Sequence, residues 1–266
     1  MTPPAPLPQP SARPRTCAIA VIAKAPRPGH VKTRLQAILQ PDEAAAMGAA
    51  FLRDTLQNLV EAGRHVPIAP FVAYAPAGQE ARFDGMLPPG TELLLADGAN
   101  GDAPGVHGFG RVLLDATRAL LARGYAAACV LGADSPTLPT ATLVRCADAL
   151  LTGRADAVLG AAEDGGYYIL GLTEPHAAPY ADIAWSTDVV AAQTRDRLAH
   201  LRLEELDRWY DVDDPASLTR LVRDITAPSR APPCATSRAT TPYPAHHTAA
   251  LVDRLRLPER LSQFAA

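Results

Sequence analysis

The chain has 266 residues, of which 48% are hydrophobic, and its formal net charge is -3 at pH 7. This length and composition suffice for a sizeable core, and the charge creates no global basic field of the kind that attracts nucleic acid. No apolar run approaches the roughly 20 residues of a membrane helix, and the Pro-rich start lacks the apolar core of a signal peptide. We therefore expect a folded cytoplasmic protein without nucleic-acid or membrane partners, and the sequence carries no clear oligomer signal.

Two Pro-rich segments flank the central part of the chain. Residues 1–15 contain almost no large apolar side chain, which predicts a disordered arm. Residues 227–248 have the same composition and are interpreted as a linker, followed over 249–266 by a short helix that breaks near Pro258. One catalytic domain is expected between them, over residues 16–226.

Apolar runs and helical patterns alternate along this central part. Five short runs have the length of strands buried on both faces: 17–23, 68–75, 92–96, 126–133 and 156–162. Apolar spacings typical of helices lie between them, at 52–60, 113–121 and 143–151. This alternation predicts an α/β fold of three layers, α/β/α, with a mostly parallel sheet. Ligands of such sheets bind beyond the carboxyl ends of the strands, so functional residues are sought there.

A basic loop follows the first predicted strand, in the stretch AKAPRPGHVKTRL at residues 23–35. Its prolines and glycine prevent it from continuing as a strand, and KTRL begins a short helical piece whose amides could face an anion. Lys24, Lys32 and Arg34 would supply positive charge suited to phosphate oxygens. A solvated basic loop is the alternative.

The stretch LGADSPTLP at residues 131–139 ends the central strand with Asp134. A carboxylate held there by a turn can bind Mg²⁺, which takes one or two protein carboxylates and completes its shell with water and substrate phosphates. The alternative is an Asx-type turn with Ser135 and Pro136 that caps the next helix.

Three acids lie close together in YDVDD at residues 210–214. In an extended chain Asp211 and Asp213 point to the same side, so both can approach one metal ion. Asp214 precedes a proline and a helix-like segment, which is typical of a helix N-cap.

Two further stretches follow predicted strands. EDGGYYILGL at 163–172 contains Gly165 and Gly166, which permit a close backbone approach or a plain hairpin turn before another strand. In IAWSTDVV at 183–190, Trp185 is a candidate for contact with the acceptor or for the core.

These five stretches, taken in order, resemble a bacterial family of GT-A-fold transferases. The family is described as arsenosugar-biosynthesis glycosyltransferase-like, or radical-SAM/selenodomain-associated, and is related to the molybdenum-cofactor and phospholactate nucleotidyltransferases. The resemblance covers about residues 17–224. Over 97–113, where the family has a Gln-Gly and a Leu-Gly-Glu-Arg-Met-like helix start, this chain differs, which leaves base and acceptor recognition open.

The resemblance implies a nucleotide-diphosphosugar-transferase-like fold and a role for each matching residue. Lys24, Lys32 and Arg34 would contact donor phosphates, and Asp134, with Asp211 or Asp213, would hold Mg²⁺ or Mn²⁺. The turn at Asp164, Gly165 and Gly166 would face the acceptor. Asp134 and Lys32 are the catalytic candidates, because the metal and the ammonium would stabilise charge on the leaving phosphate.

Three functions remain open from the sequence. The first is a metal-dependent glycosyltransferase that moves a sugar from a nucleotide-activated donor to a small-molecule acceptor. The second is a nucleotidyltransferase that moves a nucleoside monophosphate from a nucleoside triphosphate to a phosphate or phosphonate acceptor and releases pyrophosphate. The third is a nucleotide-binding protein without catalysis.

Overall fold

The computed structural model describes residues 15–226 and 241–264. The expected N-terminal arm, except for residue 15, and residues 227–240 of the expected linker lie outside this part of the chain.

A seven-stranded sheet forms the centre of the molecule, in the order β3-β2-β1-β4-β6-β5-β7. Its strands are β1 (Cys17–Ala23), β2 (Ile68–Tyr74), β3 (Glu92–Leu95), β4 (Ala127–Gly132), β5 (Ala157–Ala161), β6 (Tyr167–Leu172) and β7 (Leu203–Glu205). Only β6 runs antiparallel to its neighbours among the described strands. The mostly parallel sheet is therefore confirmed. The short, partly polar β7 was not predicted, because three residues carry too little pattern.

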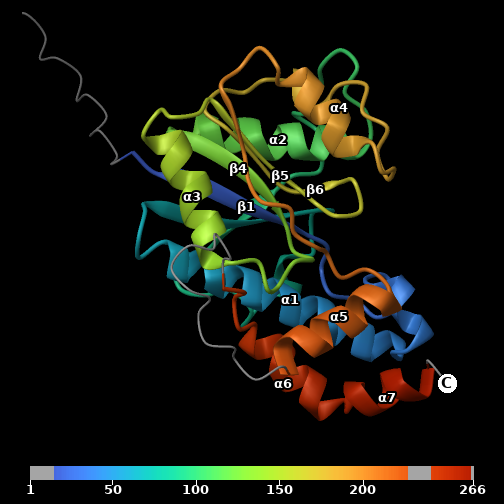
Figure 1. Cartoon of the computed structure of the whole chain (residues 1–266). Helices are drawn as coiled ribbons and strands as arrows, with labels where there is room; N and C mark the ends of the chain where they lie inside the picture. Colours follow the sequence, from blue (N-terminus) through green and yellow to red (C-terminus); the bar gives the residue numbers. More distant parts are fainter. Residues whose placement is uncertain (1–14, 227–240, 265–266) are drawn as a thin grey trace, which may run out of the picture.

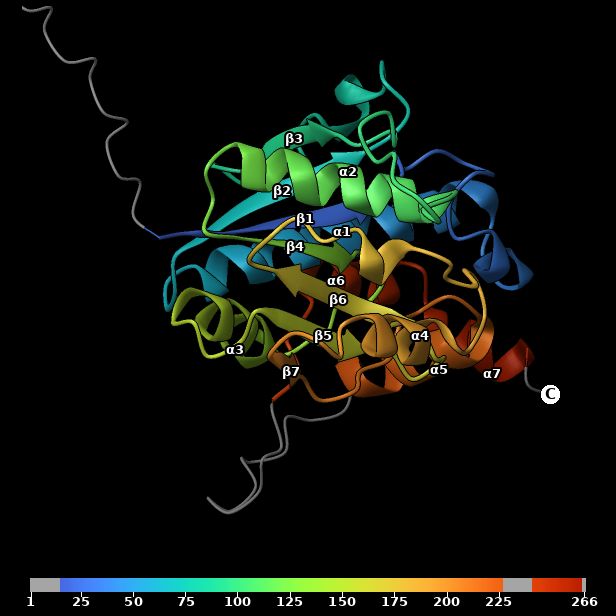
Figure 2. The same cartoon turned by 90° about the horizontal axis from the view of Figure 1, so that it is seen from above.

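Helices cover both faces of this sheet (Figures 1 and 2). On one face lie α1 (Pro41–Ala62) and α3 (Thr140–Leu151), and on the other α2 (Phe109–Ala122) and α4 (Val190–Arg197). Successive side chains of β1 alternate between the two cores: Ile19 and Val21 face α1, while Ala18 and Ala20 face α2. This confirms the three-layer α/β/α fold. No helix in the described ranges is long and apolar enough to cross a lipid bilayer.

Within the described ranges, three short 3₁₀ helices lie in the loops between these strands and helices. They are η1 (Thr33–Ala37), η2 (Glu80–Phe83) and η3 (Ala178–Tyr180). The last packs against α2 and α4 and leaves Tyr180 fully enclosed in the core beneath them.

A fourth group of helices packs on the outer side of α1: α5 (Pro215–Thr226), α6 (His246–Arg254) and α7 (Leu257–Phe264) (Figure 1). Apolar side chains from all four helices share one cluster. The boundaries expected at this end are wrong, because the linker ends before residue 246 and two helices follow it. The chain bends at Arg256, where φ is 50°, and Pro258 lies in the first turn of α7, where its missing N–H removes no helical hydrogen bond.

A buried aspartate joins α6 to α1. Both oxygens of the fully enclosed Asp54 carboxylate accept hydrogen bonds from the start of α6: from the amides of His247 and Thr248, at 2.9 and 2.7 Å, and from the Thr248 hydroxyl at 2.6 Å. These amides have no partner within their own helix, so Asp54 serves as an N-cap supplied by another helix. Further along, Arg260 pairs with Glu43 of α1 at 2.9 Å.

We expect Asp54→Ala to lower the free energy of unfolding by about 2–4 kcal/mol. The substitution leaves three donors without their charged acceptor in a buried place. Denaturant unfolding followed by circular dichroism measures the effect. Gln57→Ala, at an exposed position of the same helix, is the matched control and should change stability by less than about 0.5 kcal/mol. Equal stability of the two variants would show that α6 is not held by this cap.

Candidate functional site

Three of the predicted functional stretches meet at one edge of the sheet, because each follows a strand that runs in the same direction. The basic loop follows β1, Asp134 follows β4, and Asp164 follows β5. The chain before Asp211 lies parallel to the end of β5 through a bridge between Ala162 and Trp209. Segments that are 180 residues apart in the chain are thereby brought together.

The basic loop turns sharply before its second lysine. Gly29 has φ of 77°, and Lys32 itself has left-handed backbone angles, φ 49° and ψ 40°. Residues other than glycine seldom adopt this conformation, and it occurs most often at functional sites. The helical piece expected at KTRL is the 3₁₀ helix η1, whose five residues are too few for an anion-binding helix terminus.

The ammonium group of Lys32 lies between two of the predicted metal ligands. Its Nζ is 2.6 Å from Asp134 Oδ1 and 2.8 Å from Asp213 Oδ1, and it donates to the Val212 carbonyl at 2.8 Å. The Lys32 side chain is only 8% exposed. Burial alone would lower the pKa of Lys32, but the two carboxylates raise it overall, so Lys32 stays charged at physiological pH. Lys32 therefore cross-links the ends of two distant segments.

A pocket of about 560 Å³ opens beside this group of charges. The basic loop forms one wall with Lys24, Lys32 and Arg34, and the two carboxylates of Asp134 and Asp213 also line it. Several lining residues were not among the predicted site residues: His30, Thr33, Phe109 and Ser186. We call this the larger pocket.

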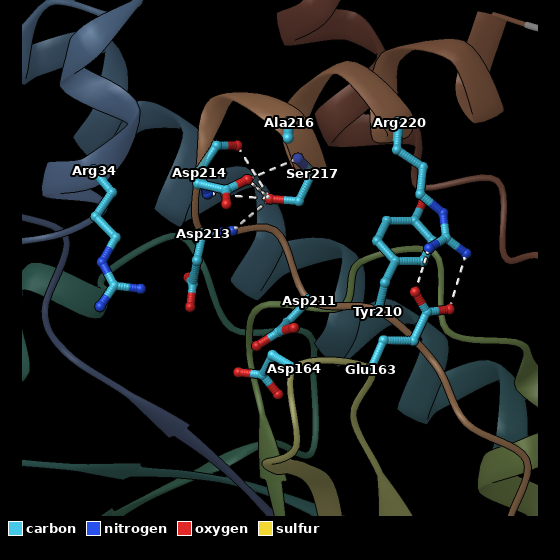
Figure 3. A pocket seen from close by; sticks show the side chains of 10 residues that line it. All are labelled: Arg34, Glu163, Asp164, Tyr210, Asp211, Asp213, Asp214, Ala216, Ser217 and Arg220. Atoms are coloured by element: carbon cyan, nitrogen blue, oxygen red, sulfur yellow. Dashed lines mark hydrogen bonds and ion pairs between the residues drawn. The ribbon is translucent and has the colours of Figure 1, made fainter. Parts of the chain in front are cut away.

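A second pocket, of about 390 Å³, is called the smaller pocket, and its lining residues are shown in Figure 3. It adjoins the larger pocket. Arg34 and Asp213 line both pockets. The remaining residues of the smaller pocket are Glu163, Asp164, Tyr210, Asp211, Asp214, Ala216, Ser217 and Arg220. Burial, together with the carboxylates of Asp164 and Asp213, raises the pKa of Asp211 to about 6. At neutral pH Asp211 is still mostly ionised, so this pocket is strongly acidic.

Side chains that are hydrogen-bonded or stacked on one another form one wall of the smaller pocket. The Arg220 guanidinium donates to Glu163 at 2.6 Å and lies over the Tyr210 ring, 3.9 Å from its centroid. The Tyr210 hydroxyl donates to Asp224 at 3.0 Å and accepts from Thr137 at 3.2 Å. The charge of Arg220 is thus already compensated, which leaves Arg34 as the other cation of this pocket.

Asp214 caps the N-terminus of α5, as expected from the sequence. Its Oδ1 accepts the Ser217 amide at 2.8 Å at the start of α5, which confirms the N-cap. The capped helix also presents Ser217 and Arg220, spaced three residues apart on one face, to the smaller pocket.

The donor atoms present suit a divalent cation. Lys32 contacts one oxygen each of Asp134 and Asp213, so each carboxylate keeps its Oδ2 for a second cation. Two carboxylates match the needs of Mg²⁺ or Mn²⁺. Asp211, the third predicted ligand, lines the smaller pocket and does not contact Lys32. Residues 15–226 and 241–264 contain no group of three or more Asp, Glu, His or Cys side chains arranged to bind a metal ion.

The turn at residues 163–166 connects β5 to β6 as a hairpin. Asp164 Oδ1 accepts the Gly166 amide at 2.8 Å, and Gly165 has φ of 92°. A Cβ at Gly165 would lie 2.0 Å from the Asp188 carbonyl oxygen, so only glycine fits. Asp164 lines the smaller pocket, whereas the two glycines line neither pocket.

Trp185 lies behind the larger pocket and lines neither one. Its ring packs edge-to-face against Phe109, with centroids 5.4 Å apart, and against Tyr167 at 6.3 Å. The next residue, Ser186, has φ of 65° and does line the larger pocket.

With this geometry established, comparisons with known proteins place the chain. Residues 55–187, half of the chain, match the model of the family DUF2064, described as "uncharacterized protein conserved in bacteria". The chain belongs to this family. The matched segment contains Asp134, Asp164 and Trp185, while the basic loop and Asp213 lie outside it. Comparison with curated proteins finds no match.

A solved structure shares the fold of this DUF2064 member. A "putative nucleotide-diphospho-sugar transferase" from Desulfovibrio desulfuricans G20 has a TM-score of 0.72 at 24% identity, over 93% of this chain and 97% of that chain. A cytidylyltransferase from Leptospira borgpetersenii is more distant, with a TM-score of 0.49 at 13% identity over 92% and 96% of the two chains. The similarity to the Desulfovibrio structure confirms the predicted nucleotide-diphosphosugar-transferase-like fold.

Proposed function

We propose that this chain is a metal-dependent transferase that moves a sugar from a nucleotide-activated donor to a small acceptor bearing a hydroxyl group. One observation carries this proposal: a pocket lined by cations and a pocket lined by acids adjoin and share Arg34 and Asp213. A transferase must hold two substrates with their reacting atoms close together. We assign the donor to the larger pocket, the acceptor to the smaller one, and the reacting centre to their shared wall. The closer relationship to the arsenosugar-biosynthesis and selenodomain-associated transferases belongs to the same proposal.

The larger pocket suits a nucleoside diphosphate. Lys24, Lys32 and Arg34 bring three cations from one loop to its wall. Lys24 and Arg34 can form short, charge-assisted hydrogen bonds with phosphate oxygens. Lys32 adds its positive charge, while its three N–H groups donate to Asp134, Asp213 and Val212. The Lys32 ammonium is held in place by its two carboxylate partners, so it needs little reorganisation when charge develops on the leaving phosphate.

Asp134 and Asp213 would hold the divalent cation with the oxygens that Lys32 leaves free. When bound, Mg²⁺ or Mn²⁺ stabilises the negative charge of a leaving diphosphate. Lys32 keeps the two carboxylates at a fixed separation, because it contacts both of them and the Val212 carbonyl.

The smaller pocket favours a hydroxyl-bearing acceptor over an anionic one. Its lining contains five carboxylates and two guanidiniums, one of which is paired with Glu163. A phosphate or phosphonate entering it would be repelled, whereas the hydroxyl groups of a neutral or cationic acceptor can donate to the carboxylates. Asp164 and its hairpin turn lie on this acceptor side.

Nucleotidyl transfer is the second candidate, and the three cations of the basic loop favour it. A triphosphate carries more charge than a diphosphate and would use all three. The acidic acceptor pocket opposes this candidate, since the phosphate or phosphonate acceptor it requires would meet Asp164 and Asp211, which form no ion pair with the described residues.

Incubation with Mg²⁺ or Mn²⁺ and a panel of nucleotide sugars and nucleoside triphosphates, followed by phosphorus NMR, tests the proposal. Release of a nucleoside diphosphate from a nucleotide sugar, stopped by a chelator, is the expected result. Release of pyrophosphate from a triphosphate would establish the second candidate instead. Metal-dependent binding without turnover of any donor, with hydroxyl acceptors present, would indicate a nucleotide-binding protein without catalysis.

A further inference from the structure

Phe109 is an exposed aromatic residue that lines a pocket. Phe109 is 48% exposed. It is one of four large hydrophobic residues that are exposed in the described ranges; the others are Leu95, Val189 and Phe264. Of these four, Phe109 alone lines either pocket. A single exposed apolar side chain is ordinary on a protein surface, so the informative observation is the place of this one, in the lining of the pocket that also contains Lys24, Lys32 and Arg34.

The ring is held from behind by core residues. Trp185 packs against it edge-to-face, with an interplanar angle of 89°, and Tyr167 in turn packs against Trp185. The neighbouring Gly110 lies directly on the indole: a Cβ there would come within 3.2 Å of Trp185 and 2.8 Å of the Tyr180 carbonyl oxygen. The start of α2 therefore packs directly against Trp185 and the Tyr180 backbone, and this contact fixes the position of the Phe109 backbone.

The composition of the larger pocket matches the two halves of a nucleotide. A flat apolar ring lines it together with the cations of the basic loop. Its volume, about 560 Å³, lies within the range of small-molecule and cofactor sites. A nucleotide also has one flat aromatic part and one anionic part, and aromatic rings stack on nucleobases of every kind.

We propose that Phe109 is the stacking surface for the nucleobase of the donor. This inference rests on the proposed function, because it assigns a nucleotide to the larger pocket. The base lies against the exposed ring of Phe109, and the phosphates extend toward Lys24, Lys32 and Arg34. Because stacking tolerates any base, Phe109 supplies affinity for nucleotides over inorganic phosphates with little choice among bases.

Isothermal titration calorimetry with uridine diphosphate, adenosine diphosphate and inorganic pyrophosphate tests this assignment. We expect Phe109→Ala to weaken both nucleotides about tenfold to a hundredfold, the effect of losing one stacking contact, and to leave pyrophosphate unchanged. Phe109→Trp should retain nucleotide affinity, while Phe109→Leu, which keeps an apolar side chain without a π face, should not. Phe264→Ala, at an exposed phenylalanine that lines neither pocket, is the matched control.

Three results would overturn the inference, and they differ in what they say of the proposed function. Unchanged nucleotide affinity in a folded Phe109→Ala protein would remove the stacking role and leave the transferase proposal standing. Failure of the unmodified protein to bind any nucleotide would remove both. An equal loss of nucleotide and pyrophosphate affinity would show that Phe109 shapes the pocket and makes no contact with the base.

Discussion

Asp134→Asn should abolish most metal-dependent turnover, by about a hundredfold to a thousandfold. The amide keeps the size of the carboxylate but removes the negative charge that would bind Mg²⁺ or Mn²⁺ and balance Lys32. The Asp134 side chain is 43% exposed, and Lys32 keeps its contacts with Asp213 and Val212, so the fold should persist. We expect the free energy of unfolding to change by less than about 1 kcal/mol.

Two measurements separate this loss of function from misfolding. Electron paramagnetic resonance of bound Mn²⁺ reports the metal site directly, and denaturant unfolding reports the fold. Asp102→Asn makes the same chemical change at a highly exposed aspartate that lines neither pocket, and should leave metal binding intact. Full Mn²⁺ binding by Asp134→Asn would remove Asp134 from the site.

Lys32→Met should have opposite effects on the metal and on the donor. The ammonium occupies one oxygen of each carboxylate, so its removal frees both acids and should tighten Mn²⁺ binding in the absence of nucleotide. Donor phosphates lose the attraction of the Lys32 charge, which should weaken nucleotides about tenfold to a hundredfold. No direct hydrogen bond is lost, because the three N–H groups of Lys32 already donate to Asp134, Asp213 and Val212. Nucleosides without phosphate should bind as before.

Lys32→Met should also lower the free energy of unfolding, by about 1–2 kcal/mol. Removing one partner of a fully buried ion pair costs about 3–5 kcal/mol, but the two carboxylates here are 43% and 42% exposed, and water can stabilise them. Lys24→Met is the matched control, because Lys24 is an exposed cation of the same pocket. It should weaken nucleotides without changing stability. If Lys32→Met weakened nucleosides and nucleotides equally, Lys32 would have only a structural role.

The basic loop contains both lysines of the chain, and the structure gives a physical reason for lysine at position 32. Lys24 and Lys32 are the only lysines in the chain, which uses arginine for every other permanent cation. A compact ammonium fits between two carboxylate oxygens and a carbonyl at 2.6 to 2.8 Å, whereas a planar guanidinium would spread them apart. Counting residue types would therefore have marked Lys32 as distinct from the arginines near it.

Some residues of the site could not be found from local patterns. Phe109 carries no motif, and Ser186 lies in the stretch IAWSTDVV but was not predicted as a site residue. Both line the larger pocket because α2 and the chain after Trp185 are packed beside the basic loop. Arg220 and Glu163 are 57 residues apart, and their pairing depends on how α5 approaches the β5–β6 hairpin. Trp185 could have faced a ligand or the core, and only its contacts with Phe109 and Tyr167 show that it supports the pocket from behind.

The sequence by itself determined the strands other than β7, their order of alternation with helices, and the edge of the sheet where the candidate site lies. Buried strands and amphipathic helices are encoded by local apolar spacing, and the direction of parallel strands then places their following loops together. The tertiary structure alone decided that Lys32 bridges Asp134 and Asp213, that two pockets of opposite character share a wall, and that α6 is capped by Asp54. Each of these depends on atoms from segments roughly one hundred or more residues apart. The same segment, AKAPRPGHVKTRL, is thus predictable as a charged loop, but its chemistry depends on the groups that the fold brings to it.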